Sequence, residues 1–183
     1  MEIRPIKSNE HQQLIDLWLE CGLTRSWNKP EEDIRRKMQV QSELLLGAFQ
    51  SGQLVGSIMA GYDGHRGWMN YVGVLPAFQR KGIGKKLVEM AEEGLKQLGC
   101  PKVNLQIRYS NSIAQDFYRR VGYSEDAAIS FGKRLVFDSN ESKLYGGSGT
   151  SGFVIRDKLK PGRGINSTLW TDYSSKIWIS KII

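Results

Sequence analysis

The chain has 183 residues, of which 40% are hydrophobic and 25% charged, a balance typical of a globular protein with one sizeable core. It has no apolar run of membrane-spanning length, no signal-peptide core in Met1–Lys7, and only two cysteines, Cys21 and Cys100, which excludes a disulfide framework and a cysteine-based metal set. We therefore expect a cytoplasmic protein with no membrane partner and no metal. The net charge of +7 falls to +3 without residues 144–183, which gives little support for nucleic acid as a partner.

The N-terminal segment predicts a short strand followed by two helices. Glu2–Ile6 reads as an edge strand, and Asn9 with Gln12 has the spacing of a capping box before a helix that runs to about Glu20. Pro30 is placed like the first residue of a second helix, whose first turn is acidic.

Three antiparallel strands and a long helix are expected next. Leu44–Gln50 and Leu54–Tyr62 flank a Ser-Gly turn, and Met69–Leu75 follows a Gly-containing turn. Gly84–Leu98 carries apolar residues at helical spacing.

The remainder of the domain predicts strand, helix and strand. Val103–Ile107 alternates as a strand, and Asn111 begins a helix with Ile113, Ala114, Phe117 and Val121 on its inward side. A strand at Ala127–Phe131, with a second candidate at Arg134–Phe137, completes the order β-α-α-β-β-β-α-β-α-β. The expected fold class is α/β, with a mixed, mainly antiparallel central sheet flanked by about four helices.

Composition changes near residue 144. Gly146–Gly152 resembles a flexible linker, and Phe153–Ile183 has too little apolar content to fold alone. We therefore expect one domain over residues 1–143, followed by a linker and basic tail over residues 144–183. The tail is open to three interpretations: a hairpin added to the sheet, a partner-binding arm, or a non-native extension.

The stretch Gln79–Gly84 joins the third strand of this series to the long helix. Two cations, two glycines and a helix start favour an anion, because bare amides and the helix dipole point there. The spacing fits neither a P-loop nor a dinucleotide fingerprint, whose third glycine would stand at Leu87. From these residues alone, a plain strand-to-helix turn remains the alternative.

Four features together resemble the GCN5-related N-acetyltransferase (GNAT) family. The family's phosphate loop [QR]-x-x-G-x-[GA] corresponds to Gln79–Gly84, and the preceding V-x-V-x-P-x-[FY] corresponds to Val72–Phe78. Leu87 follows at the expected place, and N-x-x-[AS]-x-x-[FL]-Y-x-x-x-G-[FY] corresponds to Asn111–Tyr123. Two further stretches, Tyr62–Gly67 and Gly132–Leu135, are similar to a bacterial subgroup typified by YpeA.

The resemblance implies acetyl-CoA as co-substrate. Loop amides would bind its pyrophosphate, the strand at Val72–Val74 would pair with its pantetheine arm, and an amide near Val74 would polarise the thioester carbonyl. Asn111 would anchor the pantetheine or phosphate region from the next helix. The implied loop ligands are Gln79, Arg80, Lys81, Gly82, Ile83, Gly84 and Lys85.

The resemblance also places Tyr118 as the general acid that protonates the departing thiolate, since a phenol stays protonated at neutral pH. The amine must lose a proton as well, and Glu43, Asp63 and His65 are candidates for the base, acting directly or through water. A solvated surface role for His65 and a turn-shaping role for Asp63 are the alternatives.

Aromatic side chains near the first two helices are candidates for the acceptor site. Trp27, Trp68 and Tyr71 would line a pocket for an amine, whereas Trp18 is expected to pack in the core. The predicted reaction is acetyl transfer to a primary amine by direct attack in a ternary complex, with a small-molecule amine favoured over a peptide amine. A protein N-terminal or lysine acetyltransferase and a non-catalytic acyl-CoA-binding module are the alternatives, and a homodimer is left open.

Overall fold

The structure is a computed structural model that describes residues 1–24, 28–133 and 135. Residues 1–127 fall in one compact unit, and residues 128–133 and 135 fall in a second. Trp27, the linker and the tail at residues 144–183 lie outside the described residues, and no helix that the structure describes is long and apolar enough to cross a membrane.

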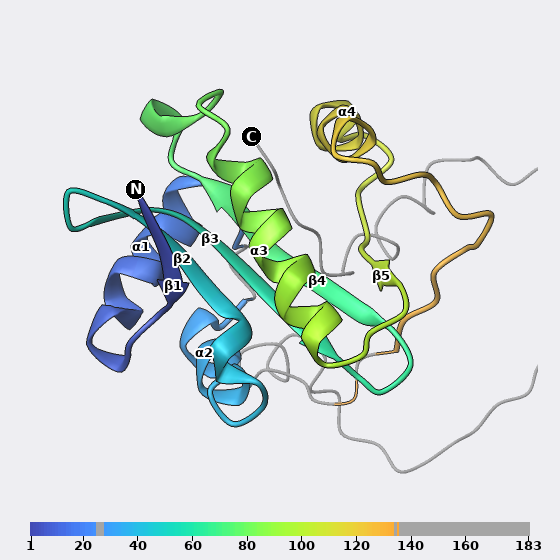
Figure 1. Ribbon diagram of the computed structural model, residues 1–183, viewed down its shortest axis with the longest axis horizontal. Helices are drawn as coiled ribbons and strands as arrows, with labels where there is room; N and C mark the ends of the chain where they lie inside the picture. Colours follow the sequence, from blue (N-terminus) through green and yellow to red (C-terminus); the bar gives the residue numbers. More distant parts are fainter. Residues whose placement is uncertain (25–27, 134, 136–183) are drawn as a thin grey trace, which may run out of the picture. The chain divides into compact units, whose positions relative to one another are not determined.

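The unit is a five-stranded sheet with helices on both faces (Figure 1). The strands lie in the order β1-β2-β3-β4-β5, and all neighbours are antiparallel except β4 and β5. Their bounds are β1 Glu2–Pro5, β2 Leu45–Gln50, β3 Gln53–Tyr62, β4 Gly67–Val74 and β5 Val103–Asn104. The helices are α1 His11–Glu20, α2 Pro30–Lys37, α3 Ile83–Gln97 and α4 Ser112–Arg120, with single 3-10 turns at Ser8–Glu10, Ser42–Leu44 and Pro76–Phe78.

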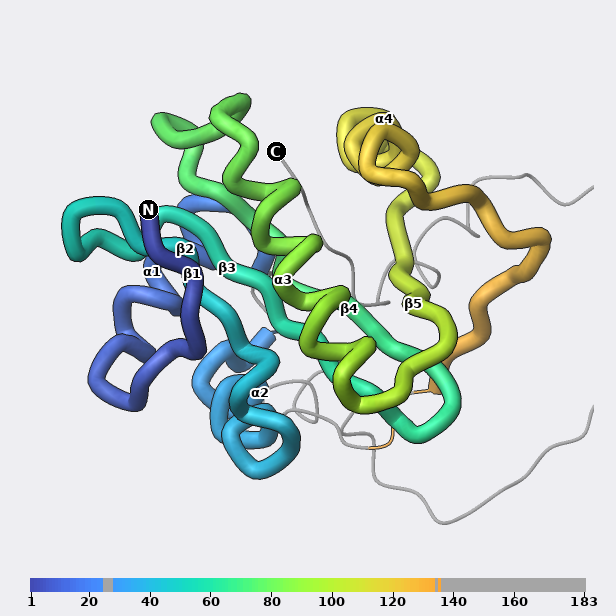
Figure 2. Tube along the Cα trace, viewed as in Figure 1, coloured from blue at the N-terminus to red at the C-terminus, as the bar shows by residue number. Residues whose placement is uncertain are grey.

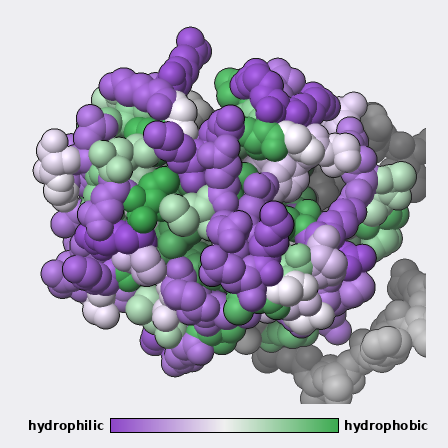
Figure 3. Space-filling view, in the orientation of Figure 1, coloured by the Kyte–Doolittle hydropathy of each residue, from purple (hydrophilic) through white to green (hydrophobic). Residues whose placement is uncertain are grey.

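Two hydrophobic cores lie on opposite faces of the sheet. Residues alternate along each strand, so Leu46 and Ala48 of β2 join the core under α3 while Leu45 and Phe49 join the core under α1 and α2. The apolar stripe of α3, made of Ile83, Leu87, Val88, Ala91 and Leu95, is buried against the first of these cores. Its opposite side is polar, and hydrophilic side chains dominate this face of the molecule in Figure 3.

The predicted order of elements is confirmed as far as α4, and four details were wrong. The capping box lies at Lys7 and Glu10 rather than at Asn9 and Gln12, because a 3-10 turn precedes α1. Ile113 is 64% exposed on α4, whereas Ala114 and Tyr118 are buried and the predicted Phe117 and Val121 pack against the same core.

The other two corrections concern strands. Val103–Ile107 forms a ladder only at Val103–Asn104, because β4 leaves β5 after Trp68. Ala127–Phe131 forms no strand among the described residues, where no ladder partner faces it, and Arg134–Phe137 lies almost wholly outside them.

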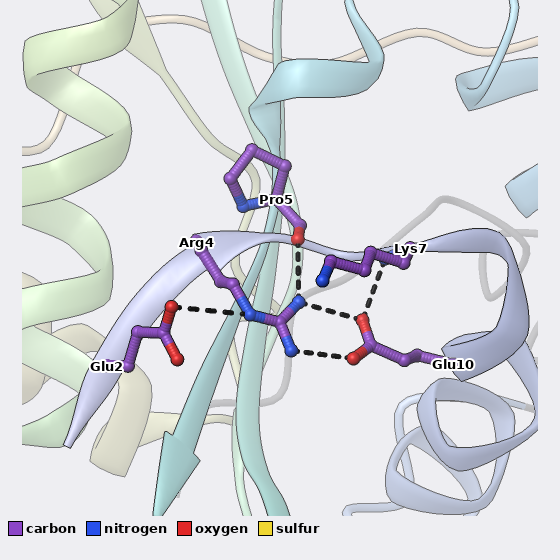
Figure 4. A network of polar contacts seen from close by, with 5 residues as sticks. All are labelled: Glu2, Arg4, Pro5, Lys7 and Glu10. Carbon is purple, nitrogen blue, oxygen red and sulfur yellow. Dashed lines mark hydrogen bonds and ion pairs between the residues drawn. The ribbon is translucent and has the colours of Figure 1, made fainter. Parts of the chain in front are cut away.

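An arginine fixes the first strand to the 3-10 turn that precedes α1 (Figure 4). The Arg4 guanidinium donates two hydrogen bonds to the Glu10 carboxylate, at 2.9 and 2.6 Å, and lies 3.8 Å above the Phe49 ring. Glu10 also accepts the Lys7 backbone N–H at 2.8 Å. The hydrogen bonds from Arg4 lower the pKa of Glu10 from an ordinary 4.5 to about 2.

Glu10→Gln is expected to lower the free energy of unfolding at neutral pH by about 1–3 kcal/mol, because a charge-assisted pair becomes a neutral one. The folded-state pKa is depressed, so this stabilisation is present above the unfolded pKa and disappears as the pH falls from about 4.5 to about 2. Urea unfolding of both proteins across that pH range measures the difference. A difference that stays constant down to the lowest pH would contradict the assignment.

Candidate active site

The site is built where β4 and β5 separate. They pair in parallel only at Gly67 with Val103 and Trp68 with Asn104, and β4 then continues alone on that side to Val74 (Figure 2). The chain after β5 leads away to α4 at the separated end (Figure 1). An extended ligand could therefore add to β4 as a strand where β5 has left it.

The backbone direction of β4 determines which amide faces this opening. The Leu75 N–H donates to the Val55 carbonyl of β3 at 2.9 Å, so Val74 has its N–H and carbonyl on the other side of the strand. The Gln79 side chain donates to that Val74 carbonyl at 3.0 Å, which ties the following loop to the end of β4. The family resemblance implies an amide near Val74 as the donor to the thioester carbonyl, and the Val74 N–H faces the opening.

A bulge in β4 sets this direction. Ser57 opposes Gly73 and Met59 opposes Asn70, so Ile58 alone faces two residues of β4, Tyr71 and Val72. Tyr71 has a φ of 50°, in the left-handed region that a bulky residue rarely adopts. The bulge interrupts the regular alternation of side chains between the two faces of the sheet. Met69 and Val72 join the core under α3, and Tyr71 joins the core under α1 and α2.

The loop Gln79–Gly84 has the backbone of an anion site. Arg80 and Gly82 have φ values of 59° and 79°, and Gly82 is the N-cap of α3 without any side-chain cap. The first amides of α3 are thus left to point out of the helix start, which is the geometry that holds phosphate oxygens. All of the predicted loop ligands lie between Gln79 and Lys85, which covers this loop and the first residues of α3, and we call the amides of this stretch the cradle.

Three cations surround the cradle. Arg80, Lys81 and Lys85 are exposed; Lys81 donates to the Ala77 carbonyl at 3.1 Å, and Lys85 lies 3.6 Å from Glu89. Lone surface ion pairs of this kind are weak, so these charges remain able to turn toward an anion.

The α4 helix approaches α3 at Gly84. A Cβ on Gly84 would stand 3.4 Å from the Phe117 ring, an ordinary van der Waals contact, so the two helices lie close there. Asn111 caps α4 by accepting the Ala114 N–H at 3.2 Å through its side-chain oxygen, which leaves its amide nitrogen as the group able to bind a ligand oxygen.

Tyr118 lies on the inward face of α4 and is 2% exposed. Its ring packs edge-on against Phe117 and Tyr123, with centroid distances of 5.2 and 5.3 Å. Tyr123 in turn donates to Glu92 of α3 at 2.7 Å, and burial raises its pKa. Phe117 of α4 and Tyr123 after the helix thus hold the Tyr118 ring in place.

The three candidate bases lie in different surroundings. The Asp63 carboxylate accepts the Arg66 and His65 backbone N–H groups, at 2.6 and 2.8 Å, and the Trp68 indole at 3.0 Å. The two backbone hydrogen bonds are the main reason that the pKa of Asp63 falls to about 2. His65 is exposed in the same turn, and Glu43 is exposed near the start of β2.

Asp63→Asn is expected to change kcat/KM by less than about threefold near neutral pH, because a carboxylate with so low a pKa accepts protons poorly. The asparagine oxygen can still accept the two backbone N–H groups, so the turn is kept. The dependence of kcat/KM on pH, measured for Asp63→Asn and for His65→Gln, shows which of the two residues acts as the base. Loss of the acidic limb in Asp63→Asn would show that Asp63 is the base after all.

The predicted acceptor aromatics do not share one environment. Trp68 is 37% exposed at the start of β4, beside β5. Tyr71 is buried: its ring stacks on Trp18, its hydroxyl donates to Asp33 at 2.7 Å, and burial raises its pKa. Trp18, fully buried, packs in the core as expected.

Sequence reasoning missed the polar groups that fix the sheet around the site. Ser57 is fully buried in β3, in an otherwise apolar run whose single hydroxyl residue was the available signal. Where β3 extends past β2, Lys37 donates to the Ala60 carbonyl, and the Gln41 side-chain amide pairs with the Tyr62 N–H and carbonyl. Burial lowers the pKa of Lys37 to about 8. Among the described residues no group of three histidine, cysteine or acidic side chains could hold a metal.

Known proteins match both the sequence and the fold. A model of the acetyltransferase (GNAT) family matches residues 11–123. An acetyltransferase of Yersinia enterocolitica is 43% identical over 138 residues, which is 75% of this chain and 98% of that protein.

Two solved structures share the fold. The aminoglycoside 6'-N-acetyltransferase AAC(6')-Ig of Acinetobacter haemolyticus is 21% identical, with a TM-score of 0.59 over 74% of this chain and 100% of that one. AAC(6')-Iy, solved with the bisubstrate analogue CoA-S-monomethyl-acetylneamine, is 20% identical, with a TM-score of 0.62 over 73% and 98%. The family match, the Yersinia relative and the shared fold agree: the chain belongs to the acetyltransferase (GNAT) family.

Proposed function

We propose that this acetyltransferase moves acetyl from acetyl-CoA to a primary amine by direct attack in a ternary complex. The observation that carries the proposal is the separation of β4 from β5 after Trp68, with β4 leading straight into the Gln79–Gly84 loop. The free edge of β4 can then receive the pantetheine arm, and the loop that follows can receive the pyrophosphate.

Each part of the site has one task in this reaction. Amides from about Arg80 to Lys85 bind the pyrophosphate, and Val72 and Val74 offer their outer backbone groups to the pantetheine amides. The Val74 N–H then donates to the thioester carbonyl oxygen, where negative charge grows as the amine attacks. Asn111 holds the arm from the side of α4.

Proton transfers complete the exchange. The amine nitrogen forms a bond to the carbonyl carbon, the carbon–sulfur bond breaks, and Tyr118 gives its proton to the sulfur as the thiolate leaves. The attacking amine loses a proton to water or to a base. Glu43 and His65 are the better candidates for that base, because the low pKa of Asp63 makes it the weakest of the three.

We favour a small-molecule amine as acceptor, with Trp68 at the edge of its site. Two of the acetyltransferases of similar fold are named for aminoglycosides, which are small-molecule amines, and that likeness supports the class of acceptor without naming the compound. The alternatives are a peptide N-terminus or a lysine side chain.

The test is a panel of small amines and peptides with acetyl-CoA, in which free CoA thiol is measured for the wild type and for Tyr118→Phe. Thiol release that depends on a small amine and falls in the variant supports the proposal. Release that depends on peptides alone would assign a protein acceptor. Tight acetyl-CoA binding with no thiol release in the presence of any amine or peptide, and with no effect of Tyr118→Phe, would indicate a non-catalytic acyl-CoA-binding module.

A further inference from the structure

Tyr71 is held in a constrained backbone conformation. It has a φ of 50° in the middle of β4, where an aromatic residue gives up favourable backbone geometry. Such a conformation persists only where surrounding contacts hold it, and strain of this kind gathers at functional sites.

Three separate contacts hold Tyr71. The Ser57 hydroxyl donates to its carbonyl at 3.1 Å, its ring stacks on Trp18 with a centroid distance of 3.8 Å, and its own hydroxyl donates to Asp33 at 2.7 Å. Asp33 is held by Arg36 at 2.9 Å. The main chain, the ring and the phenol end are therefore fixed by different elements: β3, α1 and α2.

Ser57 and Trp18 act as one unit. The Trp18 indole N–H donates to the Ser57 oxygen at 2.9 Å, and both side chains are fully buried. An indole can only donate, so it occupies a lone pair of the hydroxyl and leaves the single Ser57 hydrogen for the Tyr71 carbonyl. We call this chain of two hydrogen bonds, from Trp18 through Ser57 to Tyr71, the bulge relay.

The bulge that the relay holds decides which amide faces the opening beside β4. Before the bulge Met59 opposes Asn70, and after it Ser57 opposes Gly73. Without the extra residue, Val55 would oppose Val74 rather than Leu75, and the Val74 N–H would point into the sheet. A slip of one residue thus removes the donor from the site entirely.

We propose that Ser57 and Trp18 are positioning residues for acetyl transfer: through the bulge relay they aim the Val74 amide at the thioester carbonyl. The inference rests on the proposed function and adds to it two buried residues that touch neither substrate. Ser57→Ala removes the hydroxyl that joins these two groups, so the Trp18 N–H and the Tyr71 carbonyl stay buried and both lose their hydrogen bond to Ser57. The bulge is then free to relax.

The test compares the wild type with Ser57→Ala, Trp18→Phe and the double variant. We expect Ser57→Ala to lower kcat by about tenfold and to raise the KM for acetyl-CoA by less than that, because the pyrophosphate contacts of the Gln79–Gly84 loop do not depend on the bulge. Trp18→Phe keeps a ring on Tyr71 and loses only the indole N–H, so its loss should be smaller. The double variant should match Ser57→Ala, since the relay is already broken.

A readout that needs no acceptor separates positioning from stability. The infrared band of acetyl-CoA labelled with ¹³C at the carbonyl should move to lower frequency on binding to the wild type, and move less with Ser57→Ala. Glu10→Gln, which weakens the far edge of the sheet, is the matched control: it should lower the melting temperature and leave both the band and kcat as in the wild type. If Ser57→Ala does not fold, Trp18→Phe carries the same comparison.

The two proposals fail in different ways. A folded Ser57→Ala with the wild-type carbonyl band and wild-type kcat overturns the positioning role, whatever its melting temperature. A wild type that neither binds acetyl-CoA nor shifts the band overturns the proposed function instead. Deuterium exchange at the Leu75 amide, which donates to the Val55 carbonyl of β3, is expected to be about tenfold faster in Ser57→Ala and then still reports whether the relay holds the bulge.

Discussion

Replacing Gly84 by aspartate is expected to weaken acetyl-CoA binding by about 100-fold or more. The new carboxylate would stand at the start of α3, beside the amides that are proposed to hold the pyrophosphate, and like charges repel strongly where water is displaced. Calorimetric titration with acetyl-CoA measures the loss, and the melting temperature of the free protein shows whether the fold is kept.

Gly84→Ala is the matched control for this variant. Its Cβ would lie 3.4 Å from the Phe117 ring, an ordinary van der Waals contact, and it adds no charge. We expect its dissociation constant to stay within about threefold of the wild type. Equal losses in Gly84→Ala and Gly84→Asp would assign the effect to packing of α4 on α3 rather than to an anion site.

Tyr118→Phe is expected to lower kcat by about 100-fold while the KM for acetyl-CoA changes little, because only the proton donor is removed. The ring contacts with Phe117 and Tyr123 do not need the hydroxyl, so the variant should fold. The deficit should shrink at alkaline pH, because a thiol with a pKa of about 8.5 is then stable as the thiolate and can depart without a proton. Rates of thiol release across the pH range measure both effects.

Tyr123→Phe is the control on the same cluster. It loses the hydrogen bond to Glu92 and keeps the ring, so we expect lower stability with kcat within about twofold of the wild type. If the two variants lose activity alike, the contribution of Tyr118 is packing rather than proton transfer.

The elements that could be predicted from sequence are those whose own residues determine them. The stripe Leu87, Ala91 and Leu95 repeats with helical spacing, and α3 begins and ends within one residue of the prediction. The loop could be predicted for a similar reason: Gly82 adopts a φ of 79° that glycine permits, and the helix after it starts without a side-chain cap.

The elements that could not be predicted depend on distant partners. Whether Val103–Ile107 is paired is decided by the course of β4, and the ladder stops after Asn104 because β4 turns away. Ile113 was assigned inward from its apolar character, whereas α4 packs through Ala114 and Tyr118 and leaves Ile113 exposed. Hydrophobicity alone does not show which of two adjacent faces meets the core.

Tyr71 shows the same limit inside the site. Strict alternation from Met69 would have put the Tyr71 side chain under α3, and from its aromatic character Tyr71 is predicted to line the acceptor pocket. The bulge moves the ring to the other face, against Trp18, so that its backbone rather than its ring serves the site. The buried Ser57 was the one local sign of this arrangement, and its partners come from α1 and β4.

The claim that the end of β4 and the Gln79–Gly84 loop form an acetyl-CoA site is tested most directly by the melting temperature of the full chain with millimolar acetyl-CoA. A ligand that binds only the folded state must stabilise it, by about 2.7 kcal/mol when present at about 100 times its dissociation constant. The account predicts a clear rise for the wild type and for Gly84→Ala, and a rise several times smaller for Gly84→Asp. An unchanged melting temperature in the wild type, or the same rise in Gly84→Asp, would contradict it.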